Sequence, residues 1–294
     1  MLPRSLGRYL LVFAVLALAS MLAFAACDDD EEEEGVTPTE GETPAAAETP
    51  AAIDISDVPE LQDGTLNVGS DIAYAPFEFF QEGTEIADGL DVDMATAIAE
   101  ELGVEAEFLN TGWDGIIPAL QTEDFDVIMS AMTITDERSL EIDFVAYISV
   151  GTGIVVPTGN PNNIQDLSDL CGLTVAVQVG TIQEQMLTDQ NDECADPVNI
   201  VTFDTNPLAV EDLRTGGADA NFSDFPVAAE DAAQSEGELE VVEPQIEPEP
   251  YGIGMRKTST ELNDVITDAV QAIRDSGKYD EVLAKWNLEA VALP

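Results

Sequence analysis

The chain of 294 residues predicts an α/β protein in which strands and helices alternate. Short apolar runs such as Phe125 to Met129 predict buried strands, and between such runs apolar residues recur at helical spacing. The alternation starts at Thr65 and starts again after the segment Gly151 to Pro157. Because alternating strands and helices form parallel sheets with helices on their faces, we expect this architecture to occur twice along the chain.

The N-terminal segment has the layout of a targeting signal. Two arginines precede an apolar run that ends at Ala26, and Cys27 follows directly. This layout is typical of a secretory signal peptide, with a retained transmembrane anchor as the alternative. Small residues before a Cys resemble the bacterial lipobox, so we expect residues 1–26 to be cleaved and Cys27 to be lipidated. Two acyl chains would hold the protein on the extracytoplasmic face of the cell membrane, in the periplasm or on the outer face of the cytoplasmic membrane, without spanning it.

Residues 27–60 are rich in Asp, Glu, Thr, Pro and Ala, and the block Asp28 to Glu34 is entirely acidic. Such a segment has too little apolar surface to form a core, so we expect a disordered and extended tether. The folded body would then begin at residue 61. The whole chain has 9 basic residues against 60 acidic ones, and this balance excludes nucleic-acid binding, which needs a basic patch.

The first half of the body predicts the order strand, loop, helix, strand, helix, strand. Its first strand leads into a loop that mixes acids with aromatic residues, and its first helix places Met94, Ala97 and Ile98 on one face. The expected elements are the strand Thr65–Ser70, the loop Asp71–Phe79, the helix Asp93–Leu102, the strand Glu105–Leu109, the helix Thr111–Leu120 and the strand Phe125–Met129.

The second half repeats the alternation and closes with two amphipathic helices. Ser223 and Asp224 follow one of its strands, at the edge of the sheet where open α/β proteins bind ligands. The expected elements are the short helix Asp166–Leu170, the strand Leu173–Val177, the helix Gly180–Asp189, the strand Val198–Phe203, the helix Pro207–Arg214, the strand Ala218–Phe222, the extended segment Glu247–Met255 and the helices Ser259–Ser276 and Tyr279–Trp286.

Arg138 is the only Lys or Arg between Arg8 and Arg214. One interpretation is a helix-start arginine paired with Asp136 or Glu137. Its position favours another, because it follows the carboxyl end of the predicted strand Phe125 to Met129 by a few residues, and ligands bind beyond such ends. An arginine there can hold a carboxylate with two parallel hydrogen bonds, which a lysine cannot do.

Six segments, taken together and in this order, resemble the family 3 bacterial extracellular solute-binding proteins, which serve ABC importers of polar amino acids. These segments are Asp71–Phe79, Gly89–Asp93, Trp113–Leu120, Met132–Arg138, Val175–Thr181 and Glu249–Met255. The resemblance covers the chain after the tether. It implies a type II periplasmic-binding-protein-like fold of two α/β lobes, each a sheet flanked by helices, joined by two crossover hinge segments. These crossovers fall near 153–157 and 245–252, which gives residues 61–154 plus 250–294 to lobe one and residues 155–249 to lobe two.

The resemblance also implies the roles of eleven ligand-binding residues. Arg138 holds the ligand α-carboxylate, with help from Thr133, from the backbone of Ala131 and from Thr181 on the other lobe. Asp224 takes the α-ammonium from that opposite lobe. The remaining positions are Tyr74 and Trp113 as aromatic walls, Asp71 and Glu78 as polar contacts, and Ser130 and Gln178 as variable pocket positions.

Several of these residues also have an ordinary structural interpretation. Tyr74 and Trp113 can be core aromatics, Asp71 can cap a turn, and Glu78 can be solvated. None of the pocket positions apart from Arg138 is basic, so an acidic ligand side chain would be buried without a partner. We therefore expect a glutamine-like or an arginine- or lysine-like ligand, and the acids Asp71, Glu78 and Asp91 can each receive a cation.

The function implied by the resemblance is capture of a polar or cationic amino acid and its delivery to an ABC importer by hinge closure. The protein would be a monomer without cofactor or metal. An enzyme of the cyclohexadienyl dehydratase type is an alternative on the same fold, but only carboxylates are available for acid–base chemistry because the chain has no histidine. A sensor lobe of a receptor is a third possibility, and it calls for a further transmembrane helix or signalling domain.

The three cysteines fit one account. With Cys27 as the lipid site, Cys171 and Cys194 remain as a pair outside the cytoplasm, where disulfides persist. A thiol enzyme is disfavoured because the chain has no histidine to activate a thiolate and no Cys-x-x-Cys motif.

Overall fold

The computed structural model describes residues 52–294. The expected signal peptide, the lipidated Cys27 and most of the expected tether lie outside the described residues. Within the last part of the tether, Val58 is buried and Ile53 and Ile55 pack against the same core. Ordered packing therefore begins inside the segment that the composition assigns to the tether.

One mixed sheet of eight strands runs through the described residues in the order β5-β1-β6-β11-β7-β10-β8-β9. Its strands are β1 (Thr65–Ser70), β5 (Glu105–Asn110), β6 (Val127–Ile128), β7 (Ile142–Pro157), β8 (Thr174–Gln178), β9 (Asn199–Phe203), β10 (Ala220–Asp224) and β11 (Leu239–Arg256). Strand β1 pairs in parallel with β5 and β6, and β8 pairs in parallel with β9 and β10. The predicted parallel pairings are therefore present at both ends of the sheet, but the long strands β7 and β11 between them are antiparallel.

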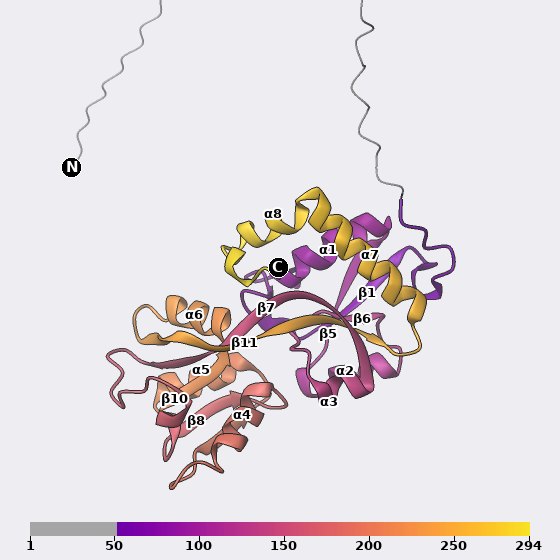
Figure 1. Cartoon of the computed structure of the whole chain (residues 1–294). Coiled ribbons are helices and arrows are strands. Elements are labelled where there is room, and N and C mark those ends of the chain that lie inside the picture. The colour runs from indigo at the N-terminus through magenta and orange to yellow at the C-terminus, as the bar shows by residue number, and fades with distance from the viewer. Residues whose placement is uncertain (1–51) are drawn as a thin grey trace, which may run out of the picture. The chain divides into compact units, whose positions relative to one another are not determined.

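Strands β7 and β11 join two lobes, as Figure 1 shows. Lobe one contains β1, β5 and β6, and lobe two contains β8, β9 and β10. The pairing of β7 with β11 extends from Ile142 with Arg256 to Pro157 with Leu239, with register shifts near Ile246 and Tyr251. Both expected crossovers lie within this long pair, and the predicted two-lobe α/β fold is confirmed.

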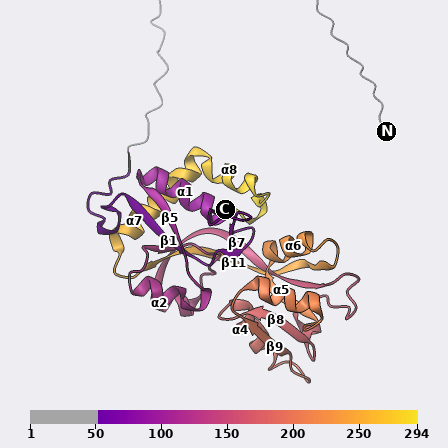
Figure 2. The same ribbon diagram turned by 180° about the vertical axis from the view of Figure 1, so that it is seen from behind.

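The helices cover the two lobes separately. In Figure 1, α1, α7 and α8 lie together on lobe one, while α4, α5 and α6 belong to lobe two, and Figure 2 shows α2 on the opposite side of the lobe-one sheet from α1. Their bounds are α1 (Leu90–Leu102), α2 (Ile116–Gln121), α3 (Asp136–Glu141), α4 (Ile182–Gln190), α5 (Asn206–Thr215), α6 (Phe225–Gln234), α7 (Thr260–Ser276) and α8 (Lys278–Lys285), with short 3-10 turns η1 (Pro59–Leu61), η2 (Trp113–Gly115), η3 (Leu167–Leu170) and η4 (Glu289–Val291).

Local sequence explains where several helices begin and end. Helix α1 starts three residues earlier than predicted and stops at Gly103, whose φ of 73° is left-handed and favours glycine. Helix α6 was not predicted, although Pro226 stands at its N-terminus, where proline is well tolerated. The expected loop after β1 contains a small antiparallel sheet formed by β2 (Ala73–Tyr74), β3 (Glu78–Phe80) and β4 (Ala87–Asp88).

Each lobe has its own apolar core. The core of lobe one combines Val68 of β1 with Ile98 of α1 and Ile266 of α7, all of them buried. The main core of lobe two combines Val177 of β8 with Phe222 of β10. Each lobe is therefore packed mainly around apolar residues of its own.

The predicted disulfide is confirmed. Cys171 follows η3 and Cys194 lies just after α4, and the two are bonded with their Cα atoms 5.5 Å apart.

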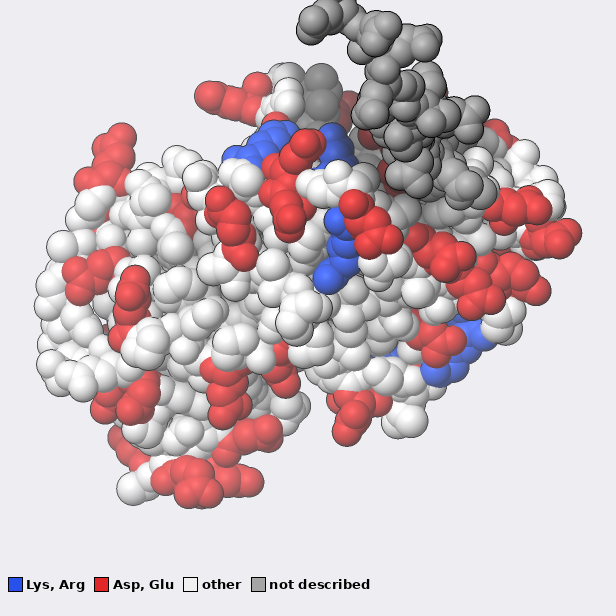
Figure 3. Space-filling model, turned by 45° about the horizontal axis from the view of Figure 1, so that its top comes forward, with Lys and Arg blue, Asp and Glu red and all other residues white. Residues whose placement is uncertain are grey.

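Carboxylates are scattered over the visible face of the protein with few basic side chains among them, as Figure 3 shows. Among residues 52–294, no helix is long and apolar enough to cross a membrane, and no group of His, Cys, Asp and Glu has the arrangement of a metal site.

Candidate functional site

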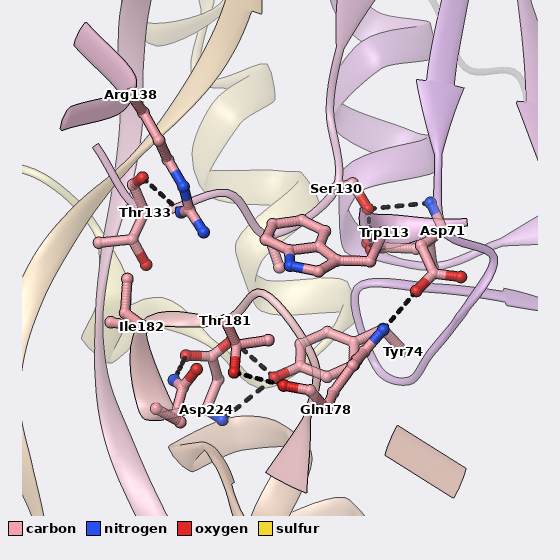
Figure 4. Close-up of a pocket in the computed structure, with 13 residues that line it drawn as sticks. Asp71, Tyr74, Trp113, Ser130, Thr133, Arg138, Gln178, Thr181, Ile182 and Asp224 are labelled. Carbon is pink, nitrogen blue, oxygen red and sulfur yellow. Dashed lines mark hydrogen bonds between the residues drawn. The ribbon is translucent and has the colours of Figure 1, made fainter. Parts of the chain in front are cut away.

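A small cavity lies between the two lobes. Its wall contains all eleven residues that the sequence suggested: Asp71, Tyr74, Glu78, Trp113, Ser130, Ala131, Thr133, Arg138, Gln178, Thr181 and Asp224. Ile182 and Gln183 complete it. The structure therefore brings together the whole set, and Figure 4 shows how the labelled side chains converge on one space.

The carboxyl ends of four strands position most of the wall. Asp71 follows β1 and Ser130 follows β6, while Gln178 ends β8 and Asp224 ends β10. The ends of parallel strands meet at one edge of a sheet, and in open α/β folds this edge carries the ligand site. The topology thus explains why residues more than 150 positions apart, such as Asp71 and Asp224, share one cavity.

Arg138 directs its guanidinium into the cavity (Figure 4). Its Nη1 donates to the carbonyl of Thr133 over 2.8 Å, and the guanidinium carbon lies 5.1 Å from the centre of the Trp113 ring. The ion pairs of residues 52–294 do not include Arg138, so the alternative of a surface pair with Asp136 or Glu137 is wrong. Burial lowers the pKa of the guanidinium, which reflects a cation held away from water.

Asp224 lies across the cavity, at the N-terminus of α6. Its carboxylate accepts hydrogen bonds from the Tyr74 hydroxyl at 2.8 Å and from Gln183 Nε2 at 2.7 Å. The Tyr74 hydroxyl in turn accepts from the main-chain N–H of Asp224 at 3.2 Å. Burial raises the pKa of Asp224 to about 6, against these hydrogen bonds, which favour the charged form.

Hydrogen bonds connect the two lobes across the cavity. Tyr74 of lobe one contacts Asp224 of lobe two, as described above. Gln178 Nε2 of lobe two donates to the carboxylate of Asp71 at 2.7 Å, and Trp113 Nε1 of lobe one donates to the carbonyl of Gly180 at 3.0 Å. The lobes are therefore in contact, and the structure represents a closed form.

Glu78 and Ser130 form a buried polar wall on the side of Asp71. The Ser130 hydroxyl donates to Glu78 Oε1 at 2.7 Å and accepts from the main-chain N–H of Asp71 at 3.0 Å. Glu78 has no exposed surface, so the interpretation of a solvated glutamate is wrong. Burial, followed by the charge of Asp91, raises the pKa of the Glu78 carboxyl well above its usual range.

Asp91 does not line the cavity, so the expectation that it can receive a ligand cation directly is wrong. It is fully buried behind Ala131, whose main-chain N–H donates to Asp91 Oδ2 at 2.7 Å. The Tyr147 hydroxyl donates to the same carboxylate at 2.8 and 2.9 Å. Asp91 thus holds Ala131, which has a left-handed φ of 45°, at the edge of the cavity.

Thr181 has a structural role in addition to its place in the cavity wall. Its hydroxyl caps helix α4 by accepting from the main-chain N–H of Glu184 and donates to the carbonyl of Gln178 at 2.8 Å. Gln183 and Ile182, in the first turn of the same helix, were not predicted as site residues. The sequence did contain a signal for them, namely the predicted helix that starts next to Thr181. When the start of a helix faces a cavity, several consecutive residues of its first turn line that cavity.

Comparison with known proteins places these features in a family. The sequence profile of the bacterial extracellular solute-binding proteins, family 3, matches residues 66–289. Among curated relatives, the L-cystine-binding protein TcyJ of Escherichia coli strain K12 is 32% identical over 224 residues, which cover 76% of this chain and 82% of that protein. The arginine-binding protein ArgT of Corynebacterium glutamicum is 31% identical over 239 residues, covering 79% of this chain and 78% of that protein.

Solved structures agree with this placement. An ancestral arginine-binding protein bound to glutamine superposes with a TM-score of 0.72 at 38% identity, covering 77% of this chain and 99% of that one. The ancestral amino acid-binding protein AncCDT-1, a precursor of cyclohexadienyl dehydratase, gives a TM-score of 0.72 at 39% identity, covering 79% of this chain and 99% of that one. With a profile match that spans most of the described residues, two lobes and a cavity between them, the chain belongs to the family 3 bacterial extracellular solute-binding proteins.

Proposed function

We propose that this protein captures a cationic amino acid of the arginine type outside the cytoplasm and delivers it to an ABC importer. One observation supports the choice of ligand above all others. The cavity places a single cation, Arg138, on one side and the acids Asp71 and Glu78 on the other, and Figure 4 shows Asp71 and Ser130 across Trp113 from Arg138. A zwitterion with a cationic side chain matches this distribution of charge.

The α-carboxylate of the ligand would bind at Arg138. The guanidinium offers a planar fork of donors, which suits two parallel hydrogen bonds to a carboxylate. The hydroxyl of Thr133 and the region of Thr181 at the start of α4 line the same part of the cavity and can add further donors.

The α-ammonium would bind at Asp224 from lobe two. The Tyr74 hydroxyl and the Gln183 amide fix the orientation of this carboxylate by the hydrogen bonds described above. A ligand cation at Asp224 favours the charged form and so opposes the pKa-raising effect of burial. The two charged groups of the ligand backbone would thus be bound mainly by different lobes.

The ligand side chain would lie along Trp113 and Tyr74, with its cation toward Asp71 and Glu78. Aromatic faces attract guanidinium and ammonium groups, which adds to the charge complementarity. A neutral glutamine-like side chain is the second candidate, because the Gln178 amide also reaches this region and an ancestral arginine-binding protein has been solved with glutamine.

Capture would proceed by hinge closure at the two crossovers. We assign residues 61–154 plus 250–294 to the first lobe and residues 155–249 to the second. The ligand would bind lobe one first, through Arg138 and Trp113, and lobe two would then close over it. Exclusion of water strengthens each polar contact, so the ligand binds the closed form more tightly and shifts the population toward it.

The sequence also supports attachment to the membrane through a lipid on Cys27, with an acidic tether between the anchor and a monomeric body.

An enzyme is the less favoured alternative. The curated relatives named above are binding proteins. AncCDT-1 is a precursor of a dehydratase, but it is itself an amino acid-binding protein.

A thermal-shift screen of the purified protein against the twenty amino acids tests the proposal. Arginine or lysine should give the largest stabilisation, because a ligand at 100 times its Kd contributes about 2.7 kcal/mol to the folded state. Calorimetry then gives the affinity. If no amino acid shifts the melting temperature, capture of a free amino acid is not the function of this cavity.

A further inference from the structure

Glu78 and Asp91 form a buried pair of acids next to the cavity. Neither side chain has exposed surface. If Glu78 is ionised, only one of its two oxygen atoms has a partner. Its Oε1 accepts from the Ser130 hydroxyl, whereas its Oε2 has no hydrogen-bond donor among the described residues. An unsatisfied charged oxygen in such a place is costly, so the protonation of the pair needs an explanation.

A shared proton satisfies the pair. The two carboxyl groups are bound by consecutive residues, Glu78 by the Ser130 hydroxyl and Asp91 by the main-chain N–H of Ala131, and the charge of Asp91 adds to burial in raising the pKa of Glu78. Two adjacent carboxyl groups in a buried site do not ionise independently, because the second charge would repel the first. With a proton on Glu78, its orphaned oxygen becomes a donor to the charged Asp91, which also accepts from Ala131 and Tyr147.

The surroundings of the pair are acidic rather than basic. Asp88 of β4 points outward, toward Lys285 at 3.9 Å. Arg274 of α7 donates to the main-chain carbonyls of Tyr147 and Leu293, each at 3.4 Å, and lies over the Tyr279 ring, so these contacts include neither acid of the pair. The other titratable groups around the pair are Asp71 from the end of β1, Tyr74 from β2, the Tyr147 hydroxyl from β7 and Asp224 from the end of β10. The side chains that face the pair therefore supply no positive charge to hold it in its doubly ionised form.

We propose that Glu78 and Asp91 share one proton while the cavity is empty, and that a cationic ligand side chain displaces this proton into solvent. Asp91 is then a specificity-determining residue that acts through Glu78 without touching the ligand. The inference rests on the proposed function, since it concerns how the same cavity tells a cationic from a neutral amino acid.

The charge balance explains the selectivity. In the empty cavity the pair carries one negative charge. A guanidinium or ammonium group replaces the proton, so the pair gains one negative charge while the ligand brings one positive charge, and the net charge of the buried site stays the same. A neutral side chain leaves the proton in place. A cationic ligand therefore binds with proton release, and its affinity falls as the pH is lowered.

Asp224 makes a matched comparison necessary. Its pKa is also raised by burial, and the ligand α-ammonium binds there in the proposed function, so every amino acid can release some proton from Asp224. Citrulline has the length and shape of arginine with a neutral urea in place of the guanidinium. Both ligands release the same number of protons from Asp224, so the difference in proton release between arginine and citrulline reports only the proton at Glu78.

Calorimetry at constant pH in buffers of different ionisation enthalpy measures the protons released. Arginine should release up to about one proton more than citrulline, and between pH 7 and 5 its affinity should fall by up to about tenfold per pH unit relative to citrulline. Glu78→Gln should abolish the extra proton released by arginine, and Asp91→Asn should reduce it while arginine still binds. Asp231→Asn should change neither quantity, because Asp231 is a half-buried acid whose pKa burial likewise raises to about 6 and which does not line the cavity.

The possible outcomes separate the inference from the function on which it rests. Equal proton release by arginine and citrulline would overturn the inference, as would an undiminished extra proton in Glu78→Gln. In either case arginine would still bind, so the proposed function would stand. If citrulline binds too weakly for calorimetry, wild-type protein and Glu78→Gln titrated with arginine give the same comparison. If neither protein binds arginine or any other amino acid, both proposals are wrong.

Discussion

Replacement of Arg138 is the most direct test of the site. In Arg138→Ala the ligand carboxylate would enter a buried space without its cation, and the hydrogen bond from Nη1 to Thr133 at 2.8 Å would also be lost. Removing one partner of a buried ion pair costs about 3 to 5 kcal/mol, which corresponds to a loss of affinity of roughly 10² to 10⁴. Arg138→Lys keeps the charge but not the fork, so we expect an intermediate loss of about 1.5 to 3 kcal/mol.

Titration calorimetry with arginine gives the affinity, and thermal unfolding without ligand reports whether each variant is folded. Arg214→Ala is the matched control, because Arg214 is an exposed arginine whose ion pairs with Glu211 and Glu238, at 3.0 and 2.8 Å, lie outside the cavity wall. Surface pairs of this kind contribute little, so its affinity should equal that of the wild type. A folded Arg138→Ala protein with an affinity within about threefold of the wild type, less than 1 kcal/mol, would refute the assignment.

Three further predictions concern the disulfide, the buried acids and the contact between the lobes. The loop closed by Cys171 and Cys194, with a sequence separation of 23, should contribute about 3 kcal/mol, so urea unfolding of the double Ser variant should show that loss while calorimetry finds the same ligand. Because burial raises the pKa of Asp224 and Asp231 from 3.8 to about 6, the folded state binds more protons than the unfolded chain across this range, and the ligand-free melting temperature should fall as the pH rises from 4 to 6; a rise would contradict this sign. Tyr74→Phe removes the hydroxyl that donates to Asp224 on the other lobe, so small-angle scattering of the ligand-free variant should show a larger radius of gyration than the wild type. An unchanged radius would mean that this hydrogen bond does not help to hold the lobes together.

Much of the fold could be predicted because its strands and helices show clear periodicity. The strand Thr65–Ser70 has the predicted bounds, and β5 and β9 differ from the prediction by one residue. The central strand is shorter than its apolar run, because only Val127 and Ile128 pair with neighbouring strands while Phe125 and Met129 are buried outside the ladder. Apolar character predicted burial there, but hydrogen bonding decided which residues form the strand.

Helix α6 and the small β2–β3–β4 sheet could not be predicted in the same way. The position of Ser223 to Pro226 after an apolar run predicts the end of a strand, although a proline at the first helical positions also favours a helix. Strands of two or three residues, such as β2 and β4, are too short to show alternation. They form because the chain must turn between β1 and α1, where Gly89 with a φ of 139° lies against the carbonyl of Phe77.

The site residues could be predicted from motifs, but the network behind them could not. Arg138 stood out by its isolation in an acidic chain, and Asp224 by its place at a strand end. Gln183 orients Asp224, and Asp91 holds Ala131, through contacts that join residues 40 or more positions apart. Sequence spacing carries no signal for such contacts, because they depend on how β6, α1, α4 and β10 are arranged in space.

In the closed form, polar groups that bind the ligand in our proposal already have protein partners. Tyr74 and Gln183 donate to Asp224, Gln178 donates to Asp71, and in the further inference a proton occupies Glu78. The ligand therefore contributes only the difference in free energy between its own contacts and the protein contacts that it replaces. Only this difference shifts the population toward the closed form. A neutral side chain would leave in place the proton that neutralises Glu78, whereas a cation would replace this proton as the positive partner of Glu78. Preference for cationic amino acids would thus follow from the exchange of the proton on Glu78 for a ligand cation, and the partners of Glu78 would control it as much as the residues that touch the ligand.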